Sequence, residues 1–308
     1  MAVYPGGLGT NERPPMLIAG WRSFCTILEM IKVEHTVFAM PFAIIGALLA
    51  ARALPHGVPP GRVTWWIVVA MVGARSAAMA FNRIADAEFD AANPRTARRA
   101  IPAGLLTTSQ VGLFTVASIA LFEYAAYRLN PLCFTLSPIA LVIILGYSYT
   151  KRYTALSHVI LGLADGISPV GAWLAVTGRF DWPPILLAAV VTLWIGGFDI
   201  IYALQDLEFD RKVGLHSIPR QLGPEAALRI SRLMHAVMMI LLVAVGHLCG
   251  LHVPYYLGLV VVAALILYEH TLVRTDDLSR INLAFFVMNG WVSIALLAFV
   301  VADRILAH

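Results

Sequence analysis

Carboxylates spaced by four residues end an apolar stretch in the first third of the chain. Asp86 and Asp90 are four residues apart and follow Asn82 by four and eight. On a helix this spacing places both carboxylates on one face, where they repel each other unless a cation lies between them. The spacing therefore predicts a divalent metal site.

The same five-residue phrase, Asp-x-Glu-Phe-Asp, occurs at residues 86–90 and again at residues 206–210. Asp199 precedes Asp206 by two helical turns, so we expect it deeper on the same face. Oxygen-only ligands suit Mg²⁺, whose coordination is usually completed by water and substrate phosphates. We therefore expect Asp86, Asp90, Asp206 and Asp210 to bind Mg²⁺ and a diphosphate.

Seven of the 18 acidic residues lie in these two phrases and just before the second. We call Asp86, Glu88 and Asp90 the first acidic cluster, and Asp199, Asp206, Glu208 and Asp210 the second. A spacing of two does not share a helical face, so both glutamates are expected to be surface charges paired with nearby arginines.

Basic residues follow each cluster, so that carboxylates alternate with cations along the chain. Arg95 and Arg99 follow the first cluster and Lys212 follows the second, while Lys151 ends an apolar run between them. Arginine and lysine are suited to the phosphate oxygens that a metal leaves uncoordinated. We expect these four residues beside the diphosphate.

The composition indicates a polytopic membrane protein of the all-α class. Of 308 residues, 59% are hydrophobic and 13% are charged, and the mean hydropathy is +0.78. The net charge of +4 does not indicate nucleic acid, because the basic residues lie in short loops between apolar segments. The lipid bilayer is the expected partner.

About nine apolar runs are long enough to span a bilayer, which takes roughly 20 residues. They cover residues 35–54, 63–82, 108–129, 131–150, 155–178, 181–204, 228–249, 252–273 and 281–302. Residues 21–30 are expected to lie along the membrane surface. Residues 1–15 are expected to form a flexible tail, and residues 16–308 a single transmembrane domain.

The distribution of basic residues predicts the orientation. Most of the 22 Lys and Arg residues fall on the side of the two acidic clusters, and the exceptions are Arg75 within a span and, on the opposite side, Arg52, Arg62, Arg128, Arg179 and Arg304. Cytoplasmic loops carry the excess of positive charge. The acidic clusters are therefore expected to face the cytoplasm.

Several separate motifs, in order along residues 30–220, resemble the UbiA superfamily of intramembrane prenyltransferases. They are Asn82-xxx-Asp86-xxx-Asp90, residues 93–96, Tyr147-xxx-Lys151 and Asp199-xx-Tyr202-xxx-Asp206-xxx-Asp210. The resemblance implies nine helices around a central cavity that opens laterally to lipid, with two Asp-rich motifs that bind Mg²⁺ and a polyprenyl diphosphate.

The resemblance also implies roles for single residues. Asn82 belongs to the first Asp-rich motif, Asp199 matches a family position upstream of the second, and Tyr147 and Lys151 match a tyrosine and lysine pair whose lysine lies near the diphosphate. Arg83 is a departure, because many members have Asp there. One candidate metal ligand is therefore missing.

The chemistry expected of such a site is prenyl transfer to an aromatic ring. Mg²⁺ and basic side chains stabilise charge on a leaving diphosphate, so that an allylic C–O bond ionises and an electron-rich ring captures the cation. Water must be excluded, since it would quench that cation. An apolar cavity in a helical bundle meets this requirement.

Residues 31–38 and 198–206 resemble a bacterial 4-hydroxybenzoate polyprenyltransferase-like branch, which implies the plasma membrane and a role in ubiquinone or menaquinone biosynthesis. Some members of this branch prenylate 1,4-dihydroxy-6-naphthoate in the futalosine route. Lys32 or Arg75 is expected to bind the carboxylate of either aromatic acid. The alternatives are an interfacial position for Lys32 and an ion pair of Arg75 with Glu123 or Asp165.

A secondary transporter or cation channel is the competing interpretation, because intramembrane carboxylates also mark ion pathways. An ion pathway needs polar groups that reach both sides of the membrane. Here the acidic clusters lie on one side, and little beyond Arg75 and Asp165 continues inward. This sidedness favours the enzyme.

Overall fold

The computed structural model describes residues 16–31 and 36–306. Within them the regular structure is helical, apart from one isolated bridge between Arg274 and Asp277. The α-helices are α1 (Met16–Ile31), α2 (Thr36–Ala50), α3 (Gly61–Ala85), α4 (Ala87–Ala92), α5 (Thr108–Leu129), α6 (Pro131–Thr150), α7 (Ser157–Thr177), α8 (Trp182–Tyr202), α9 (Leu207–Val213), α10 (Ile218–Leu222), α11 (Pro224–Leu248), α12 (Val253–Leu272) and α13 (Asn289–Leu306). Short 3₁₀ turns cover Ala51–Ala53 and Ala203–Asp206, and a π-helical turn, η4, covers Leu283–Met288.

Eight helical segments in the described part of the chain are long and apolar enough to cross a membrane. Helix α2 is a shorter apolar helix that adds a ninth to the bundle and contains Pro41. The prediction of an all-α polytopic membrane protein is confirmed. The predicted tail, residues 1–15, lies outside the described residues, and the single domain over residues 16–308 stays a prediction.

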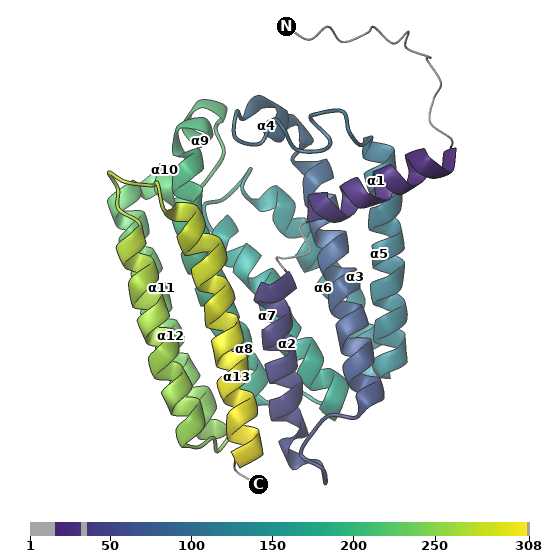
Figure 1. The fold of residues 1–308 in the computed structure, drawn as a ribbon, viewed down its shortest axis with the longest axis vertical. Coiled ribbons are helices and arrows are strands. Elements are labelled where there is room, and N and C mark those ends of the chain that lie inside the picture. The colour runs from purple at the N-terminus through teal and green to yellow at the C-terminus, as the bar shows by residue number, and fades with distance from the viewer. Residues whose placement is uncertain (1–15, 32–35, 307–308) are drawn as a thin grey trace, which may run out of the picture.

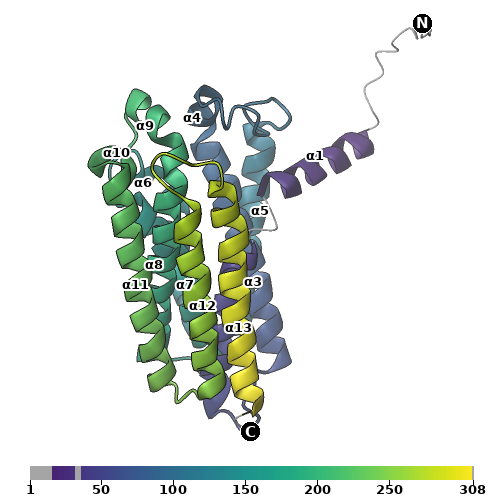
Figure 2. The same ribbon diagram turned by 60° about the vertical axis from the view of Figure 1, so that its left-hand side comes forward.

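The long helices run side by side, and α4 and α9 lie at the same end of the bundle (Figures 1 and 2). Helix α13 ends at the opposite end, and α1 crosses the bundle near the end that holds α4. Residues 21–30 lie within α1, in the crosswise position expected of a helix at a membrane surface. We call the end with α4 and α9 the polar end, because both acidic clusters reach it.

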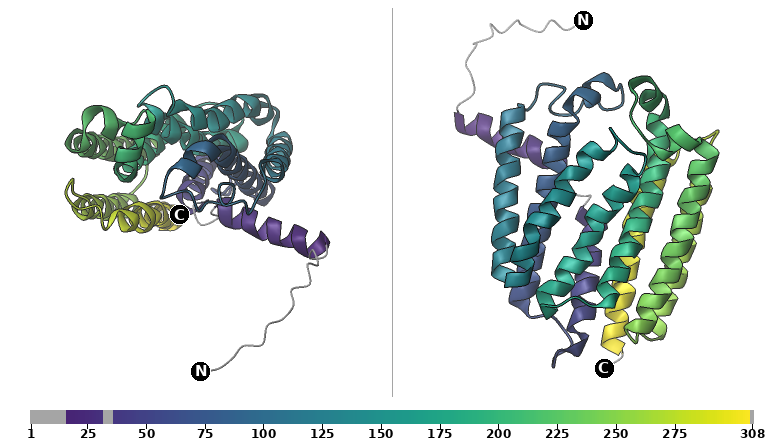
Figure 3. Two further views of the ribbon diagram at one scale, coloured as in Figure 1. Left: turned by 90° about the horizontal axis from the view of Figure 1, so that it is seen from above. Right: turned by 180° about the vertical axis from the view of Figure 1, so that it is seen from behind.

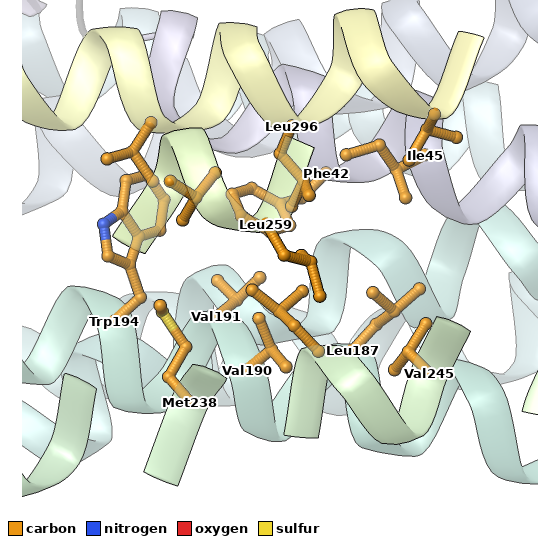
Figure 4. Close-up of a cluster of buried hydrophobic side chains, with 14 of the residues drawn as sticks. Phe42, Ile45, Leu187, Val190, Val191, Trp194, Met238, Val245, Leu259 and Leu296 are labelled. Atoms are coloured by element: carbon orange, nitrogen blue, oxygen red, sulfur yellow. The ribbon is translucent and has the colours of Figure 1, made fainter. Parts of the chain in front are cut away.

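A buried apolar cluster joins α2, α8, α11, α12 and α13. Trp194 is fully buried with its ring centroid 5.1 Å from that of Phe42, and Met238 and Leu296 belong to the same cluster (Figure 4). The indole Nε1 donates a 2.7 Å hydrogen bond to Asn289 Oδ1, so the ring buries no unpaired donor. This cluster fixes α8, whose last turn leads into the second acidic cluster.

Helices α7 and α8 pack closely along a stripe of small residues (Figure 3, right). A Cβ atom at Gly162 would collide with the Thr192 carbonyl oxygen, and one at Gly166 would lie 2.7 Å from the Ala188 carbonyl oxygen. His158 precedes Gly162 by four residues and therefore shares this face. The close packing points His158 at α8.

Candidate active site

A cavity of about 300 Å³ lies at the polar end between the two acidic clusters. Twelve of the fourteen residues that the sequence singled out as site residues line it: Arg75, Asn82, Asp86, Asp90, Arg95, Arg99, Tyr147, Lys151, Asp199, Tyr202, Asp206 and Asp210. The fold thus brings together side chains from both halves of the chain.

The other two predicted site residues are not placed there. Lys212 is exposed on α9 and does not line the cavity, because it lies on the outward face of that short helix. Lys32 lies outside the described residues.

The backbone turns at the first aspartate of each Asp-x-Glu-Phe-Asp phrase, so Asp86 and Asp90 do not lie on one unbroken helix. Helix α3 ends at Ala85, and Asp86 adopts φ −95° and ψ 1° before α4 begins. Asp206 adopts nearly the same conformation, φ −99° and ψ 4°, before α9. These values belong to the sparsely populated bridge region. The repeated phrase therefore encodes a repeated turn.

Asp86 is held by a lysine from another helix. Its Oδ2 accepts a 2.6 Å bond from Lys151 Nζ and a 3.1 Å bond from Asn82 Nδ2. Lys151 follows α6 directly, and Arg152 donates to the Ala85 carbonyl oxygen, which fastens the α6–α7 loop to the end of α3. Asp86 Oδ1 is buried with no hydrogen-bond partner among the residues that the structure describes.

Asp90 is held by an arginine from the loop after α4. Arg99 Nη1 lies 2.6 Å from Oδ1 and 2.8 Å from Oδ2 of Asp90, which is 5% exposed. Thr96 Oγ1 donates a 3.1 Å bond to the Asp90 carbonyl oxygen and thereby folds the loop back onto α4.

The same loop ties the two clusters together. Asp206 accepts bonds of 2.9 Å from Asn93 Nδ2, 2.9 Å from Arg95 Nε and 2.5 Å from Arg95 Nη2. Arg95 Nη1 donates a 3.2 Å bond to the Tyr202 hydroxyl. Burial alone would lower the pKa of Arg95, but the hydrogen bond and charge of Asp206 raise that pKa above its usual value. Arg95 is therefore a permanent cation at this rim.

The other two aspartates of the second cluster, Asp199 and Asp210, have partners other than lysine or arginine. Asp210 Oδ2 accepts a 2.7 Å bond from Ser217 Oγ. Asp199 Oδ2 lies 2.7 Å from His158 Nδ1, and the Ile218 amide donates a 3.3 Å bond to His158 Nε2. Because Nε2 accepts that bond, the proton of the neutral ring is on Nδ1 and is donated to Asp199.

Both glutamates of the acidic clusters are exposed, as their spacing predicted. Glu208 pairs with Arg211 at 2.9 Å. Neither glutamate lines the cavity.

Arg75 and Asp165 form an ion pair with a shortest distance of 3.2 Å where the cavity reaches into the bundle. A second, mainly apolar cavity of about 350 Å³ between α3, α5, α6 and α7 adjoins this point, since Arg75, Tyr147, Leu161 and Asp165 line both. Of the two carboxylates expected as partners for Arg75, Asp165 is the one that pairs with it. Glu123 instead accepts a bond from Ser137.

The cavity residues to which the sequence assigned no role include Arg83, Asn93, His158 and Ser217. Asn93 was within a recognised motif, and Arg83 was treated only as a lost ligand. No sequence pattern marks His158 or Ser217, because their roles depend on contacts with α8 and α9.

The donor set fits Mg²⁺. Among the described residues, no three Asp, Glu, His or Cys side chains are grouped closely enough to hold an ion alone. Mg²⁺ is usually held by one or two carboxylates together with substrate phosphates, and the unpartnered Asp86 Oδ1 is an oxygen available to it. A cation there would satisfy an otherwise costly buried atom.

This arrangement agrees with comparisons to known proteins. The sequence model of the UbiA prenyltransferase family matches residues 39–292. The chain belongs to the UbiA prenyltransferase family. It is therefore an enzyme that transfers prenyl groups, and the transporter or channel interpretation is set aside.

Relatives in this family are similar over most of their length. The 4-hydroxybenzoate octaprenyltransferase of Nitrosospira multiformis is 32% identical, over 84% of this chain and 87% of its own. That of Klebsiella pneumoniae is 33% identical, over 82% and 89%.

Solved UbiA structures share the fold. The apo UbiA homolog from Aeropyrum pernix is 34% identical, with a TM-score of 0.79 over 88% of this chain and 98% of its own. A UbiA homolog from Archaeoglobus fulgidus, solved with DMAPP and Mg²⁺, has a TM-score of 0.67 over 91% and 99% at 18% identity. At that identity the second likeness concerns the fold alone.

Proposed function

We propose that this UbiA-family enzyme catalyses Mg²⁺-dependent transfer of a polyprenyl chain from polyprenyl diphosphate to the ring of a 4-hydroxybenzoate-type acid in respiratory quinone biosynthesis. The observation that carries the proposal is the rim on which aspartates alternate with Lys151, Arg95 and Arg99 above an apolar interior. The family membership and the names of the curated relatives support it.

Asp86 and Asp90 on one side and Asp206 and Asp210 on the other would hold Mg²⁺. When bound, Mg²⁺ supplies positive charge for the diphosphate as it departs. Asp86, Asp90 and Asp206 would then share or exchange their present lysine and arginine partners for the metal. Lys151, Arg95 and Arg99 would donate to phosphate oxygens, whereas Lys212 does not line the cavity.

An aromatic wall faces the reacting end of the prenyl chain. Tyr202 lies against Phe285, with ring centroids 4.1 Å apart, and Phe198 meets Phe285 edge to face at 5.1 Å. All three side chains line the cavity. Their π faces attract an allylic cation, and their bulk excludes water that would quench it.

The apolar cavity between α3, α5, α6 and α7 would hold the isoprene units next to the diphosphate. Its lining is almost entirely aliphatic or aromatic apart from the Arg75–Asp165 pair and Tyr147. Burial of apolar surface favours a hydrocarbon there. The rest of a long prenyl chain would continue into lipid.

Asp199 would accept the proton of the acceptor hydroxyl, which makes the ring more electron-rich. Its Oδ2 is occupied by His158, and Oδ1 makes no hydrogen bond within the described part of the chain. We assign recognition of the acceptor carboxylate to Arg75 or Lys32. Arg75 would have to exchange Asp165 for the acid.

The chain is an integral membrane protein with eight candidate spans. The excess of basic residues at the polar end supports a cytoplasmic active site in a bacterial plasma membrane.

The deciding experiment is a prenylation assay with purified protein, Mg²⁺ and a long-chain prenyl diphosphate. 4-Hydroxybenzoate and 1,4-dihydroxy-6-naphthoate are offered separately and together. We expect prenylated 4-hydroxybenzoate. A product from the naphthoate alone would assign the enzyme to the menaquinone route. The absence of product from both compounds would reject an aromatic acid as the acceptor.

A further inference from the structure

The cationic side chains of the cavity are not equivalent. Five line it among the described residues: Arg75, Arg83, Arg95, Arg99 and Lys151. Four of them form ion pairs with carboxylates at 2.5 to 3.2 Å. Arg83 forms none of the ion pairs found in the described residues, although it is 8% exposed.

Arg83 makes little use of its hydrogen-bonding capacity. A guanidinium carries five N–H donors in a planar fork. Within residues 16–31 and 36–306, the side chain makes one hydrogen bond, from Nη1 to Asn82 Oδ1, at 3.5 Å. That distance is at the limit for a hydrogen bond. A buried charge that lacks strong partners is costly, so this side chain is suited to a ligand with several acceptor oxygens.

A second guanidinium lies near enough to Arg83 to repel it. Arg83 and Arg99 line the same cavity, where their like charges repel, and the charges of Asp86 and Asp90 attract Arg83. An anion between the two arginines would turn their repulsion into shared binding. Arg99 already pairs with Asp90, whereas Arg83 has no ion-pair partner among the described residues, so Arg83 is the arginine that takes the anion first.

The position of Arg83 on its helix explains how the charge is tolerated without a ligand. It lies in the last turn of α3, where the partial negative charge of the helix C-terminus favours a cation. A role limited to that interaction would be met by a solvated side chain. Arg83 instead turns inward and lines the same cavity as Asp86 and Lys151.

We propose that Arg83 is a diphosphate-binding residue, whose guanidinium donates to non-bridging phosphate oxygens of the prenyl diphosphate. This inference rests on the proposed function, because it assigns part of the same site. Arg83, which stands where many family members have a metal-binding Asp, thus places a positive charge beside the leaving diphosphate.

Binding measurements on purified protein in detergent with Mg²⁺ test this inference. The probes are farnesyl diphosphate, inorganic pyrophosphate and farnesol, and the variants are Arg83→Met, Arg83→Gln and Arg83→Lys. Arg98→Met is the matched control, because Arg98 is exposed nearby and does not line the cavity. Thermal unfolding shows which variants are folded.

We expect Arg83→Met and Arg83→Gln to weaken both diphosphate probes by about tenfold or more, which is the effect of losing charge-assisted hydrogen bonds. Farnesol binding should be unchanged, Arg83→Lys should restore part of the affinity, and Arg98→Met should match the wild type. If Arg83→Met does not fold, the comparison of Gln with Lys decides.

Two results would overturn the inference: unchanged diphosphate affinity in Arg83→Gln, or an equal loss for farnesol, which would assign Arg83 to packing. Either leaves the proposed function standing, provided the wild-type protein binds Mg²⁺-diphosphate and transfers the prenyl group. Failure of the wild type to do so would reject the proposed function itself.

Discussion

Lys151 Nζ lies 2.6 Å from Asp86 Oδ2, so a lysine occupies one oxygen of a carboxylate whose other oxygen has no partner in the described part of the chain. Arg99 pairs with both oxygens of Asp90, and Arg95 pairs with both oxygens of Asp206. These cations neutralise the carboxylates when no metal is bound. A metal on Asp90 or Asp206 would displace Arg99 or Arg95, and a diphosphate would give these arginines new partners.

Mg²⁺ and diphosphate are therefore expected to bind with positive coupling. Each ligand removes the electrostatic obstacle to the other, so pyrophosphate should strengthen Mg²⁺ binding about fivefold or more, and Mg²⁺ should strengthen pyrophosphate binding by the same factor. Titration calorimetry with each ligand, alone and with the other present, measures this. Equal Mg²⁺ affinity with and without pyrophosphate would contradict the exchange of partners.

Substitution of the clustered aspartates should remove activity without unfolding the protein. We expect Asp86→Asn or Asp206→Asn to lower turnover by about 100-fold or more, because charge stabilisation of the leaving group is lost. The unfolding midpoint should stay within about 4 °C of the wild type. Glu88→Gln and Glu208→Gln are the controls, since both glutamates are exposed outside the cavity. Near-normal turnover in either Asp variant would remove it from the metal set.

The Arg75–Asp165 pair should contribute strongly to stability as a pair. Removal of one partner leaves a buried charge uncompensated, which costs about 3–5 kcal/mol. Arg75→Met and Asp165→Asn are each expected to lower the unfolding midpoint, and the double variant to be less destabilised than the sum of the two. Thermal unfolding of all three in one detergent measures the coupling. Additive losses would mean that the 3.2 Å contact carries no coupling.

The close packing of α7 and α8 predicts a contrast between two glycines on one helix. Gly162→Ala would push α7 away from the Thr192 carbonyl, and such overpacking costs about 1–3 kcal/mol. Gly171→Ala should be neutral, because no atom lies within 4 Å of the added methyl group. Thermal unfolding compares the two. Equal midpoints would show that α7 shifts without cost.

The two contacts of His158 can be separated by substitution. An asparagine amide nitrogen takes the place of Nδ1 and keeps a donor to Asp199, whereas a glutamine amide reaches the position of Nε2 and keeps the contact with Ile218. If the donor orients Asp199, His158→Asn should retain about tenfold more turnover than His158→Gln. Steady-state assays at saturating donor measure the ratio, and a higher rate in His158→Gln would mean that the Ile218 contact matters more.

The membrane class, the approximate spans and the pairing of two Asp-rich motifs follow from the sequence by itself. Apolar runs long enough for a bilayer must form helices there, because no water is present to satisfy the backbone. Likewise, carboxylates concentrated in two short phrases need cations, wherever the fold places them. Twelve predicted site residues accordingly line one cavity.

Only the tertiary structure decided which cation meets which carboxylate. Asp86 meets Lys151 because α6 ends beside the end of α3. Arg95 meets Asp206 because α8 ends beside the loop after α4. Both pairs are far apart in sequence. The turn at Asp86, the inward course of Arg83 and the His158–Asp199 contact likewise depend on helix packing. Residue spacing predicts which side chains share a face of one helix, whereas these contacts join different helices. The close approach of α7 and α8, for example, brings His158 to Asp199.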